Sequence, residues 1–170
     1  MKQRIIMLRL MFIVYLYVLI RIILFKFHVI NMTYLLQQLK LVWINPERII
    51  WRMKQGNLVP FEEISTSLQA LSSHGMINLV GNVAIFIPFG ILQGLMRANN
   101  KISLMEVLIR SFGASLCLEC AQAIFSIGSF DVDDLILNTS GGVIGFLAFS
   151  MYNKFMRTEP YPIQTRTDLI

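Results

Sequence analysis

Charged residues are scarce in this chain. Asp, Glu, Lys and Arg make up 15% of its 170 residues, whereas a typical soluble domain carries about 25%. Hydrophobic residues make up 55% of the chain, which excludes a disordered tail and a collagen-like repeat. The missing charge indicates either a surface that faces lipid or an unusually large core, and the lengths of the apolar runs decide between the two.

Cysteine is also scarce, and no catalytic or metal-binding motif is present. Cys117 and Cys120 lie three positions apart in an apolar run, with no second pair to complete a metal site. The sequence contains no nucleophile elbow, Walker loop or zincin helix, so we expect no metal and no cofactor. The 15 Lys and Arg residues are scattered between apolar runs, and the net charge of +5 therefore does not indicate a nucleic-acid partner.

Four apolar segments are long enough to cross a lipid bilayer. A helix needs about 20 residues to span a hydrocarbon core about 30 Å thick. The first segment resembles a secretory signal but lacks a small-residue cleavage site, so we interpret it as an uncleaved anchor. The predicted spans are residues 5–25, 75–96, 102–127 and 134–152. We therefore predict an all-α, polytopic bundle of four transmembrane helices over residues 1–158, followed by a polar cytoplasmic tail over residues 159–170.

The distribution of basic residues predicts the orientation of this bundle. With the N-terminus inside, eight Lys and Arg residues fall on the cytoplasmic side and six on the outer side. The turn at residues 128–133 contains no base and carries Asp131 and Asp133. The positive-inside rule then places this turn outside the membrane and both termini in the cytoplasm.

The segment from residue 27 to residue 73 is too polar to span a membrane. Its helical spacing of apolar residues and its two tryptophans, Trp43 and Trp51, are typical of a membrane interface. Pro46 and Pro60 each stand near a helix start, with acidic residues in the first turn. We expect a long outer loop of short interfacial helices joined by an extended stretch at residues 57–61, with irregular lipid-facing loops as the alternative.

Polar residues within three of the spans fall at one depth. Counting about 1.5 Å per residue along a helix, they lie in the outer part of each span, just beneath the acidic turn. Within each span they are three or four residues apart, so each helix can turn one polar stripe toward the interior. The residues predicted to form an outward-facing pocket are Asn78, Asn82, Glu119, Gln122, Asp131, Asp134 and Asn138.

Structural roles explain part of this pattern. Asn and Gln hydrogen bond between membrane helices, contributing about 0.6 to 2 kcal/mol each, and acidic residues at a helix start interact favourably with the helix dipole. Glu106 and Arg110 are spaced i,i+4 and can neutralise one another. Glu119 has no such neighbour and is costly inside a bilayer, so it is the leading functional candidate.

Three strings within about residues 50–150 together form a recognisable pattern. They are Asn57-Leu-Val-Pro60-Phe61, the segment from Asn78 to Gly90, and Glu119-Cys-Ala-Gln122 followed by the acidic turn and Asn138-Thr-Ser-Gly141-Gly142-Val-Ile-Gly145. The pattern resembles the VanZ-like family of small bacterial membrane proteins. The resemblance adds Asn57 and Pro60 of the outer-loop motif to the candidate site residues.

The resemblance implies a multi-pass protein of the bacterial cytoplasmic membrane. The founding member of the VanZ-like family is linked to resistance to the glycopeptide teicoplanin. An arginine often stands just before the acidic turn in this family, but residues 127–129 of this chain are Ile-Gly-Ser. In this chain, the positive charge of that arginine would therefore have to come from Arg48 or Arg52 of the outer loop.

Three functions fit these residues, and all of them have the lipid bilayer as a partner. The first is a pocket that binds a cation, an amine or the headgroup of an envelope lipid, including a glycopeptide-related ligand. The second is an intramembrane enzyme with Glu119 as general base and the acidic turn holding a divalent ion, although no nucleophile is evident. The third is a scaffold that binds a partner protein through its glycine faces. The sequence does not indicate the oligomeric state.

Overall fold

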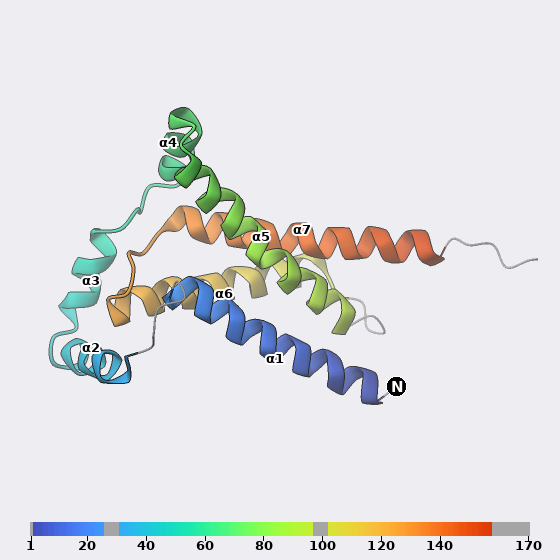
Figure 1. Cartoon of the computed structure of the whole chain (residues 1–170), viewed down its shortest axis with the longest axis horizontal. Helices are drawn as coiled ribbons and strands as arrows, with labels where there is room; N and C mark the ends of the chain where they lie inside the picture. Colours follow the sequence, from blue (N-terminus) through green and yellow to red (C-terminus); the bar gives the residue numbers. More distant parts are fainter. Residues whose placement is uncertain (1, 26–30, 97–101, 158–170) are drawn as a thin grey trace, which may run out of the picture.

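The computed structural model describes residues 2–25, 31–96 and 102–157. These residues form helices joined by short connections (Figure 1), which confirms the predicted all-α fold. The helices in chain order are α1 (Lys2–Phe25), α2 (Met32–Ile44), α3 (Glu47–Lys54), α4 (Glu62–Ala70), α5 (Ser73–Met96), α6 (Leu104–Phe125) and α7 (Val132–Arg157).

Four of these helices, α1, α5, α6 and α7, are long and apolar enough to cross a membrane. This finding confirms the four predicted spans. Large apolar side chains such as Ile13, Tyr17 and Ile109 are exposed on their outer surfaces, where only lipid can cover them. The start of α1 and the end of α7 lie at the same end of the bundle, opposite to α2, α3 and α4 (Figure 1). The chain is therefore a multi-pass membrane protein.

All four spans differ from the predicted bounds at one end or both. α1 begins at Lys2 and α5 at Ser73, ahead of the predicted residues 5 and 75, and the bounds of α6 and the start of α7 follow from capping. α6 is two residues shorter at each end than residues 102–127. Its start is capped by the side chain of Ser103, which accepts a hydrogen bond from the amide of Glu106, and it ends where Ser126 adopts a left-handed φ of 57°. α7 begins at Val132, two residues before the predicted start, and continues past residue 152. The predicted tail at residues 159–170 lies outside the described residues.

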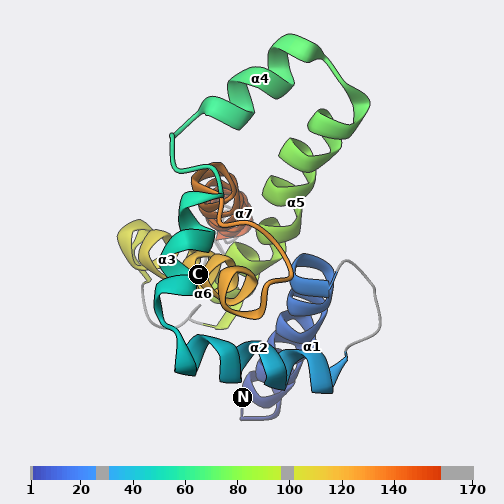
Figure 2. The same cartoon turned by 90° about the vertical axis from the view of Figure 1, so that its left-hand side faces the viewer.

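The outer segment contains three short helices, as the sequence predicted. Figures 1 and 2 show α2, α3 and α4 at one end of the bundle. α3 begins directly after Pro46. α2 is held on the end of α6, because the Tyr34 hydroxyl donates to the carbonyl of Ser126 (3.0 Å) and the Ser126 hydroxyl donates to Gln38 (3.0 Å). Trp43 is 88% exposed, and its position in the membrane interface stays a prediction.

The stretch at residues 57–61 is not extended throughout. Asn57 forms an isolated parallel bridge with Asp131, but the chain then turns. The amide of Glu62 donates to the carbonyl of Val59 (3.3 Å), and Phe61 has a φ of 68° and a ψ of 6°. These values describe a type II turn with Pro60 at its second position and Phe61 at its third, and α4 begins at the next residue, Glu62.

α5 and α7 form the closest helix pair because glycines bring their backbones together. A Cβ atom added to Gly90 would lie 1.9 Å from the carbonyl oxygen of Gly142, and one added to Gly145 would lie 2.0 Å from that of Ile87. Such small residues permit close approach of membrane helices. The glycine faces are thus buried inside the chain, and the expectation that they bind a partner protein is wrong.

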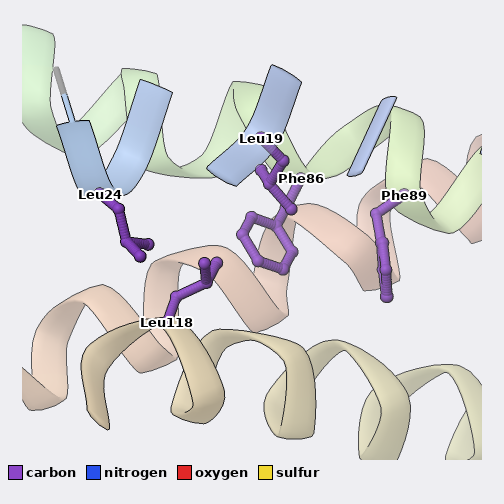
Figure 3. Packing of buried hydrophobic residues seen from close by; sticks show 5 residues of the cluster. All are labelled: Leu19, Leu24, Phe86, Phe89 and Leu118. Carbon is purple, nitrogen blue, oxygen red and sulfur yellow. The ribbon is translucent and has the colours of Figure 1, made fainter. Parts of the chain in front are cut away.

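α1 packs against α5 and α6 on the other side through an apolar cluster. Figure 3 shows Leu19 and Leu24 of α1 lying near Phe86 and Phe89 of α5 and Leu118 of α6. The Tyr15 hydroxyl also donates to the carbonyl of Ile85 (2.7 Å). Because this cluster fixes the last turns of α1 beside α5 and α6, it also positions one wall of the site described below.

Substitution of Gly145 by Ala tests the close approach of α5 and α7. The added methyl group meets backbone atoms of Ile87 that cannot move aside, so we expect a loss of about 1–3 kcal/mol in the free energy of unfolding. Gly113→Ala is the matched control, because a Cβ at Gly113 meets nothing within 4 Å. Unfolding of the purified protein in detergent measures both variants, and equal stability of the two would contradict the packing described.

Candidate functional site

Hydrogen bonds from the first turn of α7 and from Asn57, in the segment between α3 and α4, hold the acidic turn before α7 in place. The carboxylate of Asp131 accepts a hydrogen bond from the amide of Asp133 (2.7 Å) and so caps α7. The same oxygen accepts a hydrogen bond from the side-chain amide of Asn57 (3.1 Å), and the Asn57 carbonyl accepts one from the amide of Val132 (3.0 Å). Gly56 lies against Phe130 so closely that a Cβ would lie 1.9 Å from the Phe130 carbonyl oxygen.

Asp133 fixes the start of α4 from a different helix. Its side chain is buried, with 1% of its surface exposed. The carboxylate accepts hydrogen bonds from the backbone amides of Phe61, Glu63 (2.8 Å) and Ile64 (3.0 Å). These amides have no partner within α4, and an acceptor at this position interacts favourably with the helix dipole. Asp133 therefore acts as the N-cap of α4 and determines where the outer segment lies.

A cavity of about 570 Å³ lies between the ends of α1, α5, α6 and α7 at the end of the bundle where α2, α3 and α4 are found. Five of the predicted site residues line it: Asn78, Asn82, Gln122, Asp131 and Asp134. They come from α5, α6 and the acidic turn with the start of α7. Glu63 of α4 and His74 of α5 also line the cavity.

The polar side chains of this wall are oriented by hydrogen bonds. The side-chain amide of Asn82 donates to the carboxylate of Asp134, so its amide oxygen is directed away from that bond. The side-chain amide of Gln122 donates to the backbone carbonyl of Ile23 (3.1 Å). Asn78 is exposed on the cavity rim. The cavity wall thus combines amide side chains, two of them held by hydrogen bonds, with carboxylates.

The two remaining predicted pocket residues, Glu119 and Asn138, do not line the cavity. Each is buried, with 1% of its surface exposed. One carboxylate oxygen of Glu119 accepts a hydrogen bond from the backbone amide of Asp131 (2.9 Å), so Glu119 supports the acidic turn from behind. The side-chain amide of Asn138 donates to the hydroxyl of Ser115 (2.9 Å). A substrate in the cavity would not contact Glu119 directly, and the interpretation of Glu119 as a general base gains no support.

The residues of the outer-loop motif hold the site together rather than line it. Asn57 binds the acidic turn, and Pro60 occupies the turn that precedes α4. In the sequence, Glu63 is only one of the acidic residues in the helical turn after Pro60, and no motif marks His74. Their place in the cavity depends on how α4 folds back onto α7, which no spacing in the sequence reveals.

The charge of the cavity wall is negative. Glu63, Asp131 and Asp134 line it, and its described lining contains no Lys or Arg. Arg48 and Arg52 instead line a separate hollow of about 390 Å³ beside Trp51, so neither arginine supplies a positive charge to the cavity.

The described part of the chain contains no group of three or more His, Cys, Asp or Glu residues that could hold a metal ion. The acidic turn is a poor metal site for a clear reason. The carboxylate of Asp133 is occupied by amides of α4, and that of Asp134 is bound by Asn82. The proposal of a divalent ion at this turn therefore finds no support among these residues.

Glu63 titrates near neutral pH because of its acidic neighbours. A hydrogen bond with the Asp131 carboxylate, partial burial and the negative charges of Asp131, Asp134 and Asp133 raise the pKa of Glu63 to about 7. When it carries a proton, the Glu63 carboxyl can donate a hydrogen bond to the Asp131 carboxylate and so join α4 to the acidic turn.

Substitution of Asp133 tests its role as the cap of α4. Asp133→Ala leaves the amides of Glu63 and Ile64 without their acceptor, which costs about 1 kcal/mol and should speed their hydrogen exchange about fivefold. Asp133→Asn keeps one acceptor oxygen and should have a smaller effect. Exchange rates measured in detergent by mass spectrometry distinguish the variants. Unchanged protection of α4 in Asp133→Ala would show that the cap is unimportant.

The raised pKa of Glu63 predicts a pH dependence of stability. The folded protein keeps a proton that the unfolded chain releases near the ordinary pKa of 4.5. The free energy of unfolding should therefore fall as the pH rises from about 4.5 to about 7. Glu63 is exposed, so solvent screening keeps the effect small.

Melting temperatures measured in detergent across this pH range check the prediction. Glu63→Gln should flatten the pH profile, because Gln cannot titrate. Glu62→Gln changes the neighbouring residue, which does not line the cavity, and should keep the slope of the unaltered protein. A Glu63→Gln profile as steep as that of Glu62→Gln would refute the assignment.

Comparison with known proteins agrees with this architecture. The sequence profile of the family VanZ/LLP1 matches residues 12–153. The chain is also 32% identical over 123 residues to "Protein VanZ" of Enterococcus faecium, which covers 70% of this chain and 72% of that protein. No solved structure is significantly similar to this chain. The chain is a member of the VanZ/LLP1 family of membrane proteins.

Proposed function

We propose that this protein binds the amine of a cell-envelope lipid or of a lipid-tailed glycopeptide in its acidic cavity, and thereby contributes to resistance to teicoplanin. The protein lies in the bacterial cytoplasmic membrane, with the cavity facing outward and both termini in the cytoplasm. The observation that carries the proposal is the cavity wall, in which three carboxylates and three amide side chains come together at one end of the bundle.

The chemistry of the wall favours a cation. An ammonium group donates up to three hydrogen bonds and accepts none, and the wall offers carboxylate oxygens of Glu63, Asp131 and Asp134. Asn82 is already bound to Asp134, which leaves its amide oxygen as a further acceptor. The volume of about 570 Å³ lies within the usual range for small-molecule sites and suits a headgroup rather than a whole glycopeptide.

The position of the cavity favours a ligand that is anchored in lipid. Its wall is formed by the outer turns of membrane spans, and the exposed surfaces beside it are apolar. A ligand with an acyl tail can place the tail in the bilayer and its polar group in the cavity. Teicoplanin carries such a tail, and the link to resistance comes from the likeness to the VanZ family.

Asp134→Asn tests whether the cavity recognises an amine. The substitution keeps the shape of the side chain and an acceptor for Asn82 but removes a negative charge. Loss of one charge-assisted hydrogen bond should weaken amine binding about tenfold. Binding is measured as the rise in melting temperature when the protein, in detergent, receives phosphatidylethanolamine, with N-acetylated phosphatidylethanolamine as the ligand that lacks the cation. Equal responses to the two lipids would refute recognition of an amine.

Drug susceptibility tests the link to resistance. Expression in a susceptible Gram-positive host should raise the inhibitory concentration of teicoplanin more than that of the same glycopeptide without its acyl chain. Asp134→Asn should lose this protection at equal membrane abundance. Glu62→Gln, a charge change outside the cavity, should keep it. Full protection by Asp134→Asn would show that resistance does not depend on the cavity.

A further inference from the structure

A row of buried polar side chains continues from the acidic turn into the middle of the bundle. On α6, Glu119, Ser115 and Ser111 follow one another at intervals of four residues, so they lie on one face. Across from them on α7 lies Asn138, which donates to the hydroxyl of Ser115 (2.9 Å). None of these four side chains is more than 1% exposed.

The row reaches past the middle of the membrane through α5. The hydroxyl of Ser111 lies beside Gly142 of α7, where an added Cβ would be 2.2 Å from it, and Phe89 of α5 borders the same position. Gln93 follows Phe89 at i+4, one turn further along α5, and is 2% exposed. It lies three residues, or about 5 Å, from the end of α5 at Met96.

Several atoms of this row are buried without a hydrogen-bond partner. They are one carboxylate oxygen of Glu119, the side-chain oxygen of Asn138, the hydroxyl of Ser111, and both polar atoms of the Gln93 side chain. In a bilayer, each such atom costs several kcal/mol unless a partner is found. Their burial on three facing helices is therefore evidence that they bind small polar molecules.

The spacing of the row suits water. Glu119, Ser115 and Ser111 are about one helical turn, or 5–6 Å, apart along the axis of α6, and one water molecule can bridge two polar atoms at such a separation. Apolar residues alone would pack these helices without cost, whereas the observed residues supply donors and acceptors at every turn. Chains of this kind with a carboxyl group mark proton paths in membrane proteins.

We propose that the polar row from Glu119 to Gln93 is a hydrated path along which protons cross the bundle. A proton from the acidic cavity binds the Glu119 carboxylate, and passes by way of bridging waters at Asn138, Ser115 and Ser111 to Gln93. One proton leaves the far end for each that enters, so no redox partner is needed. The transmembrane pH gradient and potential drive the movement.

The charged groups that act on Glu119 are the carboxylates of Asp131 in the turn and Asp134 at the start of α7. The path uses other residues than the proposed amine site, because none of its members lines the cavity from which the proton comes. It is tested without any amine ligand, so either proposal can fail alone.

Proton entry into liposomes tests the path. The purified protein is reconstituted with a pH-sensitive dye inside, and a potassium gradient with valinomycin sets a membrane potential. The protein should acidify the lumen faster than protein-free liposomes. Glu119→Gln keeps an acceptor for the amide of Asp131 but cannot carry a proton, and Asn138→Leu removes a polar site at similar volume. Loss of one hydrogen-bonding site should slow entry about tenfold.

A matched control separates the path from general damage to the bundle. Ser140→Leu changes an exposed residue of α7 two positions from Asn138 and should leave the rate unchanged. Helical content and melting temperature identify any variant that fails to fold. If Asn138→Leu fails to fold, the rate of proton entry with Glu119→Gln decides the test. The proposal is overturned if the unaltered protein admits protons no faster than protein-free liposomes, or if Glu119→Gln is as fast as the unaltered protein.

Discussion

The arrangement of this protein depends on three aspartates at the start of α7. Asp131 caps α7 and binds Asn57, Asp133 caps α4, and Asp134 binds Asn82 of α5. Glu119 of α6 accepts the backbone amide of Asp131. This short segment thus joins α4, α5, α6 and α7, and also binds Asn57. Its carboxylates would repel one another if each did not accept hydrogen bonds from its own donors. Removal of any one donor leaves negative charge confined at the membrane surface.

The bilayer explains why these groups gather at one end. Polar side chains inside lipid need partners from neighbouring helices, while those at the interface can also use water and each other. The glycines of α5 and α7 bring these two helices close enough for such contacts deeper in the bundle. Close packing and polar contacts are therefore linked. On the other face of α7, Gly142 lets Ser111 of α6 lie beside the helix, and a wider spacing of α6 and α7 would expose the polar row.

The polar residues fall into two groups with different surroundings. Asn82, Gln122 and Asp134 border a cavity, where a ligand can replace water. Glu119 and Asn138 are enclosed, so they can exchange only small partners such as water or protons. Asp131 belongs to both groups, because its side chain borders the cavity and its amide binds Glu119. Asp131 is therefore the residue that connects the cavity to the buried row.

The sequence alone determined the four spans and the short helices between the first two of them. These features follow from hydrophobic run length and helical periodicity, which are local properties. The tertiary structure decided that Glu119 and Asn138 lie behind the cavity, that Glu63 and His74 border it, and that Asp133 caps α4. Each of these depends on the angle at which one helix meets another and on the return of the outer segment across α7. Such long-range contacts arise from packing between residues far apart in the chain, and no local spacing encodes them.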